Sequence, residues 1–364
     1  MNRIGVSVII CCHNSAARLP STLGHVQAQV GTEGIPWEVI VVDNASTDDT
    51  SEVARRVWGT GRSPLLVVKE PRSGLSHARL RGFQESSYEF LSLIDDDNWV
   101  APHWVARTYQ IMAKRYDVGA CGGHGSAVFD GAVPPAWFEQ FSSAYAVGPQ
   151  GESQGWVNPN RSFLYGAGLT IRRSAFADLV LGGFRPVLSD RRGAALSSGG
   201  DSELCHALVL AGWKLWYDPE LKFQHFIPES RLHWDYLRAL HRGFGAAAAW
   251  LELYMWQIVP PRNLEFQKLP LPESWCQAIR KSWLFQLYST IQTIRRQWRR
   301  ARGPWRGQQS EGSADVLRME WELARAIEIF SHPLQYRKAR RSIERAKWLR
   351  TTGKSGLEQT LARV

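Results

Sequence analysis

Short hydrophobic runs alternate with longer, mixed polar segments over the first hundred residues. The runs are almost unbroken in apolar side chains, and they lie at residues 6–12, 37–42, 64–69 and 90–94. Unbroken runs of this length are typical of strands buried on both faces of a parallel sheet. The segments between them have helical length, and they cover residues 15–30, 46–57 and 75–85, with Ser15 expected to cap the first. The alternation predicts an α/β fold with a mostly parallel, doubly wound sheet and helices on both faces.

The pattern loosens after residue 97. A helix is predicted over 102–116, a Gly-, Ser- and Asn-rich stretch follows at 142–161, and a further helix begins at Asp201. Beyond residue 230 the pattern is helical, and this part holds nine of the 17 tryptophans. We therefore expect one domain at 1–245, built from a nucleotide-binding half at 1–100 and an acceptor half at 101–245, and then a basic, Trp-rich helical extension at 246–364.

The net charge of +10 is unevenly distributed along the chain. Residues 1–230 carry 20 Lys and Arg against 23 Asp and Glu, whereas residues 231–364 carry 24 against 11. The first part is therefore mildly acidic, and the whole basic excess belongs to the C-terminal part.

The basic extension has more than one explanation. Residues 283–300 combine aromatic and aliphatic side chains with four arginines between 295 and 300. That composition is typical of a helix lying on an anionic membrane surface, so we predict peripheral contact with such a membrane. An auxiliary helical domain with a solvated basic face also explains it. Nucleic acid is disfavoured as a partner, because no recognisable RNA- or DNA-binding module accompanies the arginines.

Cysteine usage and hydropathy indicate a reducing compartment and no membrane span. Five cysteines are scattered without metal-type pairs, and the adjacent Cys11 and Cys12 fall in an apolar run, so a disulfide framework is not expected. No signal-peptide pattern precedes the first predicted strand. The longest apolar stretch, 244–259, contains Glu252 and is too short and too polar for a transmembrane span. We expect a cytoplasmic location, with peripheral attachment at the inner face of the cell membrane.

Three consecutive carboxylates, Asp95, Asp96 and Asp97, follow the fourth hydrophobic run. In an open parallel sheet, ligands bind beyond the carboxyl ends of the strands. Adjacent carboxylates repel unless a cation or hydrogen-bond donors compensate, and oxygen ligands suit Mg²⁺ or Mn²⁺ bound together with a diphosphate. An acidic turn in solvent is the alternative. Asn14 and Asp43 end the first and second runs, and each could contact a ligand or only cap the next element.

Together these residues resemble the bacterial family 2 glycosyltransferases of the GT-A fold. The resemblance covers roughly residues 4–245 and lies in five blocks whose order and spacing are specific. The blocks are VSVIICCHN at 6–14, VIVVDNASTDDT at 39–50, EPRSGLSHARLRGF at 70–83, FLSLIDDDNW at 90–99 and GGDSELCHAL at 199–208. The resemblance implies an enzyme that transfers a sugar from a nucleotide-diphosphate donor, with inversion at the anomeric carbon.

The resemblance also implies a donor site. The turn after the first strand would cradle the nucleotide, Asp43 would face the base, Asp96 would approach the ribose or diphosphate, and Arg79 would meet a phosphate. The implied donor-binding residues are Cys12, His13, Asn14, Asp43, Arg79 and Asp96. A UDP-sugar is the implied donor, although Asp43 alone does not distinguish UDP from GDP or dTDP.

A metal and a base follow from the same resemblance. Asp97 would ligate Mn²⁺ or Mg²⁺, with Asp95 as a supporting ligand. His225 would lie near the metal or the diphosphate, or else be a packed imidazole. Asp201 would deprotonate the acceptor hydroxyl during in-line attack, although an aspartate that opens a helix also suits an N-cap. The residue before it is Gly200, where relatives commonly have Glu.

The implied acceptor is a glycan or a polyisoprenyl-linked sugar in cell-envelope or exopolysaccharide synthesis. Two other classes remain open. A non-catalytic nucleotide-sugar or glycan-binding relative would explain Gly200 as decay of the base site. A sugar-phosphate nucleotidyltransferase would share the sheet but should carry a Gly-rich, basic loop after the first strand, which this chain lacks. The chain also departs from the family pattern at Cys11, where Pro is usual, and at Leu80, where Asn is frequent.

Overall fold

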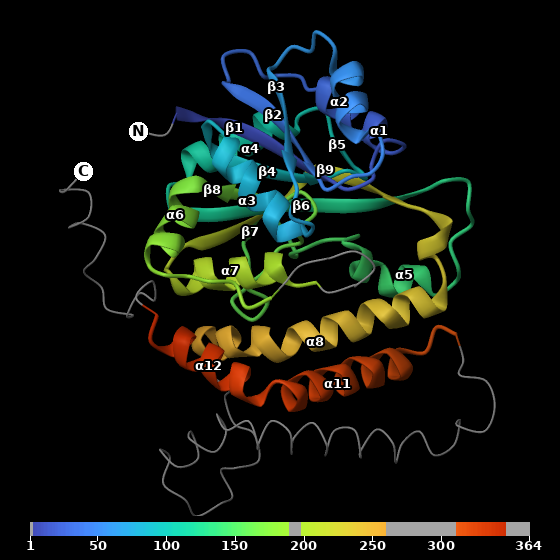
Figure 1. Ribbon diagram of the computed structural model, residues 1–364, viewed down its shortest axis with the longest axis vertical. Helices are drawn as coiled ribbons and strands as arrows, with labels where there is room; N and C mark the ends of the chain where they lie inside the picture. Colours follow the sequence, from blue (N-terminus) through green and yellow to red (C-terminus); the bar gives the residue numbers. More distant parts are fainter. Residues whose placement is uncertain (1–2, 189–197, 260–310, 347–364) are drawn as a thin grey trace, which may run out of the picture.

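The computed structural model describes residues 3–188, 198–259 and 311–346, and they form a nine-stranded sheet flanked by helices (Figure 1). The strands are β1 (Arg3–Cys12), β2 (Trp37–Asn44), β3 (Leu65–Glu70), β4 (Tyr88–Asp95), β5 (Asn98–Val100), β6 (Val118–Phe129), β7 (Gly155–Trp156), β8 (Thr170–Arg172) and β9 (Lys214–Ile227). The sheet order is β3-β2-β1-β4-β8-β6-β9-β5, and β7 pairs with β9.

The N-terminal half of the sheet is parallel, as the hydrophobic runs predict. Strands β3, β2, β1 and β4 are neighbours in that order, and all three pairings are parallel. Ile10 pairs with Val41 on one side and with Ile94 on the other, so β1, β2 and β4 end at the same edge. The polar residues that follow these strands therefore meet at one edge of the sheet. The predicted α/β class is confirmed.

The other half of the sheet is mixed. β8 runs antiparallel to β4 and β6, and both β5 and β7 run antiparallel to β9, whereas β6 and β9 are parallel. The chain reaches β8 through the loop-rich stretch 146–169 and not through a crossover helix. Parallel neighbours need a crossover connection, so β8 can run antiparallel to β4 and β6. The parallel arrangement expected for most of the sheet thus describes only its N-terminal half, β1 to β4.

Helices cover both faces of the sheet (Figure 1). They are α1 (Leu19–Gln27), α2 (Thr50–Trp58), α3 (Leu75–Glu85), α4 (Trp104–Lys114), α5 (Phe138–Phe141), α6 (Arg173–Leu181), α7 (Gly200–Leu210), α8 (Trp234–Ile258), α11 (Ala314–Ser331) and α12 (Pro333–Glu344), with 3-10 turns η1 (Ser142–Tyr145) and η2 (Glu229–Arg231). On one face, Ile10 shares a core with Leu23 of α1 and Trp104 of α4. On the other, Ile9 packs with Phe83 of α3. Because alternate residues of β1 enter two cores, its hydrophobic run is unbroken.

The first helix begins later than its sequence predicts. α1 starts at Leu19, and Arg18 rather than Ser15 occupies the N-cap position, so the predicted cap at Ser15 is wrong. The backbone N–H of Ser15 instead donates to the hydroxyl of Thr50 at 2.8 Å. Residues 13–18 therefore form a turn that is tied to the neighbouring loop, and this turn belongs to the site described below.

The C-terminal helices α8, α11 and α12 continue the fold beneath the sheet (Figure 1). α8 runs unbroken across residue 245, so the expected domain boundary falls within a helix. Arg325 of α11 donates to Glu252 of α8 at 2.6 Å, and a Cβ at Gly245 would lie 2.1 Å from the Trp321 carbonyl oxygen, so the two helices approach closely. No helix within the described residues is both long enough and apolar enough to cross a membrane.

Two of the sequence predictions reach beyond the described parts of the chain. The arginine cluster at 295–300 and Cys276 lie outside the described residues. Of the cysteines that the structure does describe, Cys12, Cys121 and Cys205 are buried thiols that form no disulfide within the described residues.

Candidate active site

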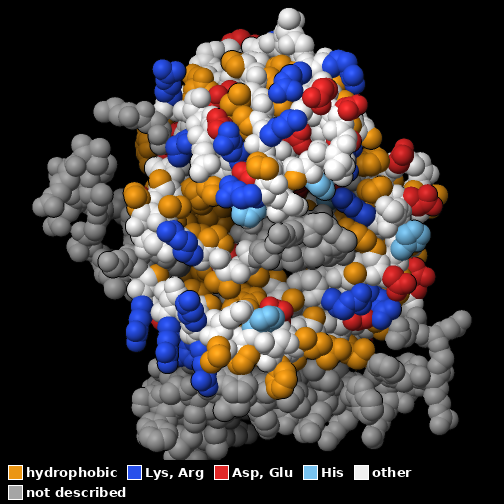
Figure 2. Space-filling model, viewed as in Figure 1, with side chains coloured by type: hydrophobic (Ala, Val, Ile, Leu, Met, Phe, Trp, Pro, Cys, Tyr) orange, Lys and Arg blue, Asp and Glu red, His pale blue; other side chains and the backbone are white. Residues whose placement is uncertain are grey.

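A cavity of about 790 Å³ lies at the carboxyl edge of the parallel strands, between the sheet and α8. Its polar wall comes from the ends of β1 and β4 and the turns that follow them. Its apolar wall comes from α8, which contributes side chains such as Leu240, Phe244 and Leu251. Figure 2 shows hydrophobic side chains gathering in the hollow between the sheet and the long helices. The cavity therefore joins a polar half to an apolar half.

Most of the predicted site residues line this cavity. Those that do are Cys12, His13, Arg79, Asp95, Asp96, Asp97, Asp201 and His225. Asn14 and Asp43 are not among its lining residues. Asn14 adopts φ of +50°, and its side-chain oxygen accepts from the N–H of Thr47 at 2.8 Å. The buried Asp43 accepts from the hydroxyl of Ser51 at 2.5 Å. Both residues make the loop-fixing contacts of the capping alternative.

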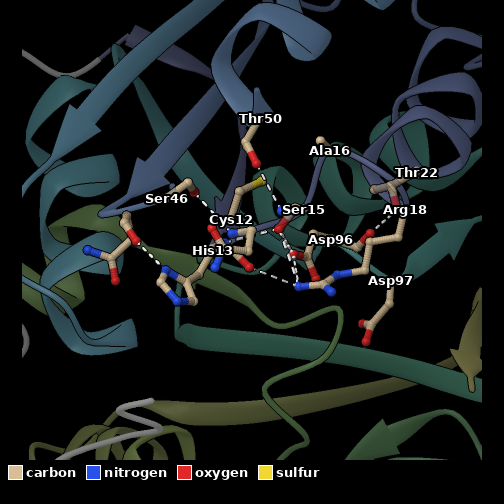
Figure 3. A network of polar contacts seen from close by, with 12 residues as sticks. Cys12, His13, Ser15, Ala16, Arg18, Thr22, Ser46, Thr50, Asp96 and Asp97 are labelled. Carbon is tan, nitrogen blue, oxygen red and sulfur yellow. Dashed lines mark hydrogen bonds and ion pairs between the residues drawn. The ribbon is translucent and has the colours of Figure 1, made fainter. Parts of the chain in front are cut away.

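Asp96 is held by the turn after β1. Figure 3 shows Ser15 and Arg18 pointing at its carboxylate: the Ser15 hydroxyl donates to Oδ2, and Arg18 Nη2 donates to the same oxygen at 2.8 Å. The Thr22 hydroxyl donates to the backbone carbonyl of Asp96 at 2.8 Å. Burial and then the charge of Asp97 raise the pKa of Asp96, although Arg18 opposes the shift. The network fixes the turn and the acidic segment relative to each other.

His13 and Cys12 line the cavity beside that network. His13 Nδ1 donates to the backbone carbonyl of Asn44 at 2.7 Å, because a carbonyl can only accept. The amide of Asn44 in turn donates to the carbonyls of Glu70 and Arg72, at 3.0 and 2.7 Å. The Cys12 thiol is buried, and burial raises its pKa well above the usual value, so it contributes shape rather than reactivity.

Asp97 lies between Arg231 and His225. Arg231 Nη1 is 3.0 Å from Oδ2, and His225 Nε2 is 3.5 Å from Oδ1. Burial alone would raise the pKa of Asp97, but His225 and Arg231 outweigh it and hold that pKa well below its usual range. Burial opposes protonation of His225, yet Asp97 raises the pKa of the imidazole. By contrast, burial and the charge of Asp97 raise the pKa of Asp95.

The Asp97–His225 pair fits a divalent cation. His225 Nδ1 donates to the carbonyl of Tyr145 at 2.6 Å, so Nε2 is the nitrogen that faces Asp97. A histidine held in this way presents Nε2 as a ligand. Adjacent ligands of an octahedral ion lie about 3 Å apart, close to the Asp97–His225 separation. Within the described residues, no three His, Cys, Asp or Glu side chains are grouped to hold a metal ion. Diphosphate oxygens commonly complete such a coordination shell.

Asp201 lies on another wall of the cavity, in the first turn of α7. Its Oδ2 accepts from the backbone N–H of Gly166 at 2.6 Å. A Cβ at position 166 would lie 2.9 Å from Asp201 Oδ2 and 3.0 Å from Arg79 Nη2. Asp201 and Arg79 therefore approach the same point, and the bare glycine backbone leaves room for both. The N-cap of α7 is Gly199 rather than Asp201, so the N-cap alternative for Asp201 does not apply.

Three residues of the site escaped the sequence analysis. Arg18 and Arg231 reach the acidic segment from 78 and 134 residues away, and Asn44 joins loops that follow two different strands. Arg18 and Arg231 carry no local signal, because arginines are common on helix surfaces. Asn44 has one, since a polar residue that ends a buried strand at the ligand edge is a site candidate.

The fold and the cavity define an α/β protein with an acidic ligand site at the carboxyl edge of a parallel sheet. Residues 7–180 match the family model described as Glycosyl transferase family 2. The match confirms the resemblance to the family 2 glycosyltransferases of the GT-A fold. This part of the chain, just under half of its length, is a family 2 glycosyltransferase domain.

Individual relatives match over shorter or more divergent stretches. The glycosyltransferase AglE of Haloferax volcanii is 34% identical over 104 residues, which are 28% of this chain and 33% of that protein. The undecaprenyl-phosphate 4-deoxy-4-formamido-L-arabinose transferase of Pectobacterium carotovorum is 29% identical over 114 residues, 31% of this chain and 35% of that one. The glucosyl-dolichyl phosphate glucuronosyltransferase of H. volcanii is 21% identical over 242 residues, 66% and 75% of the two chains. The first two matches thus span about a third of those relatives.

Two solved structures are similar at low identity. S. aureus TarS 1-349 in complex with UDP has a TM-score of 0.48 and 15% identity, and the match covers 94% of this chain and 91% of that one. The mannosyltransferase PcManGT from Pyrobaculum calidifontis, in complex with GDP-Man and Mn²⁺, has a TM-score of 0.49 and 16% identity, with 91% and 88% covered.

Proposed function

We propose that the protein is a metal-dependent, inverting glycosyltransferase. It would move a sugar from a nucleotide-diphosphate donor, a UDP-sugar in our proposal, to a glycan or polyisoprenyl-linked acceptor in cell-envelope or exopolysaccharide synthesis. One observation carries the proposal: Asp201 lines the same cavity as the Asp95–Asp97 segment, and that segment lies within the residues that match the family 2 glycosyltransferase model. The names of two relatives include undecaprenyl-phosphate and dolichyl phosphate, which supports a lipid-linked acceptor.

Each wall of the cavity has a separate task in this proposal. Asp97 and His225 would hold Mn²⁺ or Mg²⁺ with Asp95 nearby, and the ion would neutralise the donor diphosphate. The Arg18–Asp96 pair would keep the donor-side turn in place. Asp201, oriented by the Gly166 N–H, would accept the proton of the attacking hydroxyl in a single displacement, which inverts the anomeric carbon.

Nucleotide-sugar binding tests the donor assignment. We expect a nucleoside-diphosphate sugar to raise the melting temperature by a few degrees only when Mn²⁺ or Mg²⁺ is present, because a ligand that binds the folded state stabilises it. Thermal-shift assays with UDP-, GDP- and dTDP-sugars, with the ion or with EDTA, measure this. His225→Ala should reduce the metal-dependent part of this rise in melting temperature. His25→Ala, which removes an imidazole stacked on Trp99 instead, should not. A protein stabilised equally by all nucleotides, or by none, would contradict the proposal.

We further propose a peripheral, cytoplasmic-face contact with an anionic membrane. Leu323, Ile327 and Phe330 are 47%, 56% and 67% exposed, and their spacing places them on one face of α11. Figure 2 shows hydrophobic side chains along this lower edge of the described surface. α12 follows α11 in the chain and carries the exposed Arg341, and its C-cap residue is the exposed Arg345. Apolar side chains beside cations suit an interfacial helix on anionic lipid.

Replacing Leu323, Ile327 and Phe330 together by Ser should reduce co-flotation with phosphatidylglycerol-containing vesicles several-fold, because it removes the apolar anchor. The melting temperature should change little, since these side chains are exposed. Leu181→Ser removes an 86% exposed leucine from α6 and serves as the control. Equal flotation of the triple variant and the parent protein would refute the contact.

A further inference from the structure

Arg161 and His206 bring unpartnered polar atoms to the wall of the cavity. Arg161 Nε donates to the carbonyl of Phe163 at 3.1 Å, but its Nη2 is buried without a partner among the described residues. His206 is only 2% exposed, and in the described parts of the chain no hydrogen bond of ordinary geometry reaches either ring nitrogen, although the Arg161 backbone lies close enough to raise its pKa. Buried polar groups are almost always paired, so two such residues at one cavity wall require an explanation.

The two side chains differ in charge. Arg161 is stacked on aromatic rings, with its guanidinium carbon 4.6 Å from the centre of Phe163 and 5.1 Å from that of Tyr165. It forms no ion pair with any carboxylate of the described chain. Burial lowers the pKa of His206 to about 4, which the backbone of Arg161 only partly offsets, so the ring is neutral at pH 7. The pair therefore offers one fixed positive charge and one neutral imidazole.

The position of these residues links them to Asp201. The segment 160–167 forms one wall of the cavity, and its Gly166 N–H holds the Asp201 carboxylate at 2.6 Å. Arg161 precedes Gly166 by five residues in the same wall. On α7, His206 follows Asp201 by five residues, about 7.5 Å along the helix axis. Both residues thus lie further along the two elements that carry and orient the proposed base.

The backbone beside Arg161 has an uncommon conformation that neighbouring elements hold in place. Ser162 adopts φ of +45°, a left-handed conformation that is uncommon for a residue with a side chain. Its hydroxyl donates to the Met255 sulfur of α8 at 3.0 Å, and its backbone N–H donates to the Asn158 carbonyl at 2.9 Å. Strained residues persist where the surrounding structure holds them, and they cluster at ligand sites.

We propose that Arg161 and His206 form an acceptor subsite that binds an oxyanion, either a phosphate or a sugar carboxylate. Arg161 would pair with the anion, because a guanidinium fork matches planar and tetrahedral oxyanions. His206 would add one neutral hydrogen bond. An anion held there would direct a neighbouring hydroxyl of the acceptor toward Asp201. The inference rests on the proposed function, since it treats Asp201 as the residue that meets the acceptor.

Direct binding tests the subsite without catalysis. Two pairs of probes separate the sources of the anion: glucuronate against glucose, and farnesyl monophosphate against farnesol. We expect the full-length protein to bind one anion at least tenfold more tightly than its neutral partner in calorimetric titrations. Arg161→Gln should lower the affinity for that anion by about ten- to a hundred-fold, because a hydrogen bond to a charged group is lost. Arg115→Gln is the matched control, since it removes an arginine stacked on Trp216 outside the cavity.

The His206 variant separates a binding role from a structural one. His206→Leu should keep or raise the melting temperature of the free protein, because it removes two buried nitrogens without ordinary hydrogen bonds. It should still lower the affinity for the anion. The subsite would be overturned if neither anion bound the parent protein, or if Arg161→Gln bound the anion as tightly as the parent does. It would also be overturned if His206→Leu had a lower melting temperature and unchanged anion binding. Loss of nucleotide-sugar binding in Arg161→Gln would also overturn it, since Arg161 would then serve the donor. If the parent binds no nucleotide sugar, the proposed function fails independently.

Discussion

Asp201→Asn is expected to lower kcat for sugar transfer by about 10²- to 10⁴-fold, because the amide cannot accept the proton of the attacking hydroxyl. The substitution keeps the size of the side chain, and the amide oxygen can still accept from the Gly166 N–H. Donor binding should therefore be nearly unchanged. Steady-state transfer assays give kcat, and thermal shifts with the nucleotide sugar report binding on the same preparation.

The control for this variant is the same substitution in another helix. Asp235→Asn lies in the first turn of α8 with its side chain 89% exposed. Both variants remove a carboxylate near a helix N-terminus, which costs about 0.3–1 kcal/mol in stability. Only Asp201→Asn should lose transfer. If Asp201→Asn kept full activity, Asp201 would not be the base. Donor binding without transfer in the parent protein would instead favour the non-catalytic alternative.

Local pattern was sufficient for the parallel half of the fold and for the acidic wall of the cavity. The hydrophobic runs predicted β1 to β4. Three of these strands, β1, β2 and β4, are buried on both faces, and such strands have nearly unbroken runs of apolar residues. The carboxylates from Asp95 to Asp97 could be placed because the end of a parallel strand is also the ligand edge of the sheet. Both inferences depend only on residues that are neighbours in sequence.

Contacts between distant segments were beyond the reach of the sequence. Nothing near Arg231 indicates that it reaches Asp97, 134 residues away. Ser15 was predicted to cap a helix, but the nearby Asp96 carboxylate offers its hydroxyl a charged acceptor. In each case a tertiary partner decides what a polar side chain does.

The second large effect is expected at Asp97. Asp97→Asn should lower the free energy of unfolding by about 3 kcal/mol, because the partly buried Arg231 guanidinium would lose the carboxylate that neutralises it. It should also abolish the metal-dependent stabilisation by a nucleotide sugar, since the ion would lose its proposed carboxylate ligand. Urea unfolding measures the first effect, and thermal shifts with and without Mn²⁺ measure the second.

Two further variants separate the structural and ligand-binding parts of this result. Asp95→Asn makes the same change two residues away, where burial and Asp97 disfavour the charge, so it should cost less than about 1 kcal/mol of stability. Adding Arg231→Gln to Asp97→Asn removes the uncompensated guanidinium and should restore part of the lost stability. It should not restore donor binding, because no carboxylate returns beside His225. Recovery of metal-dependent donor binding in the double variant would show that Asp97 only neutralises Arg231 and does not hold the ion.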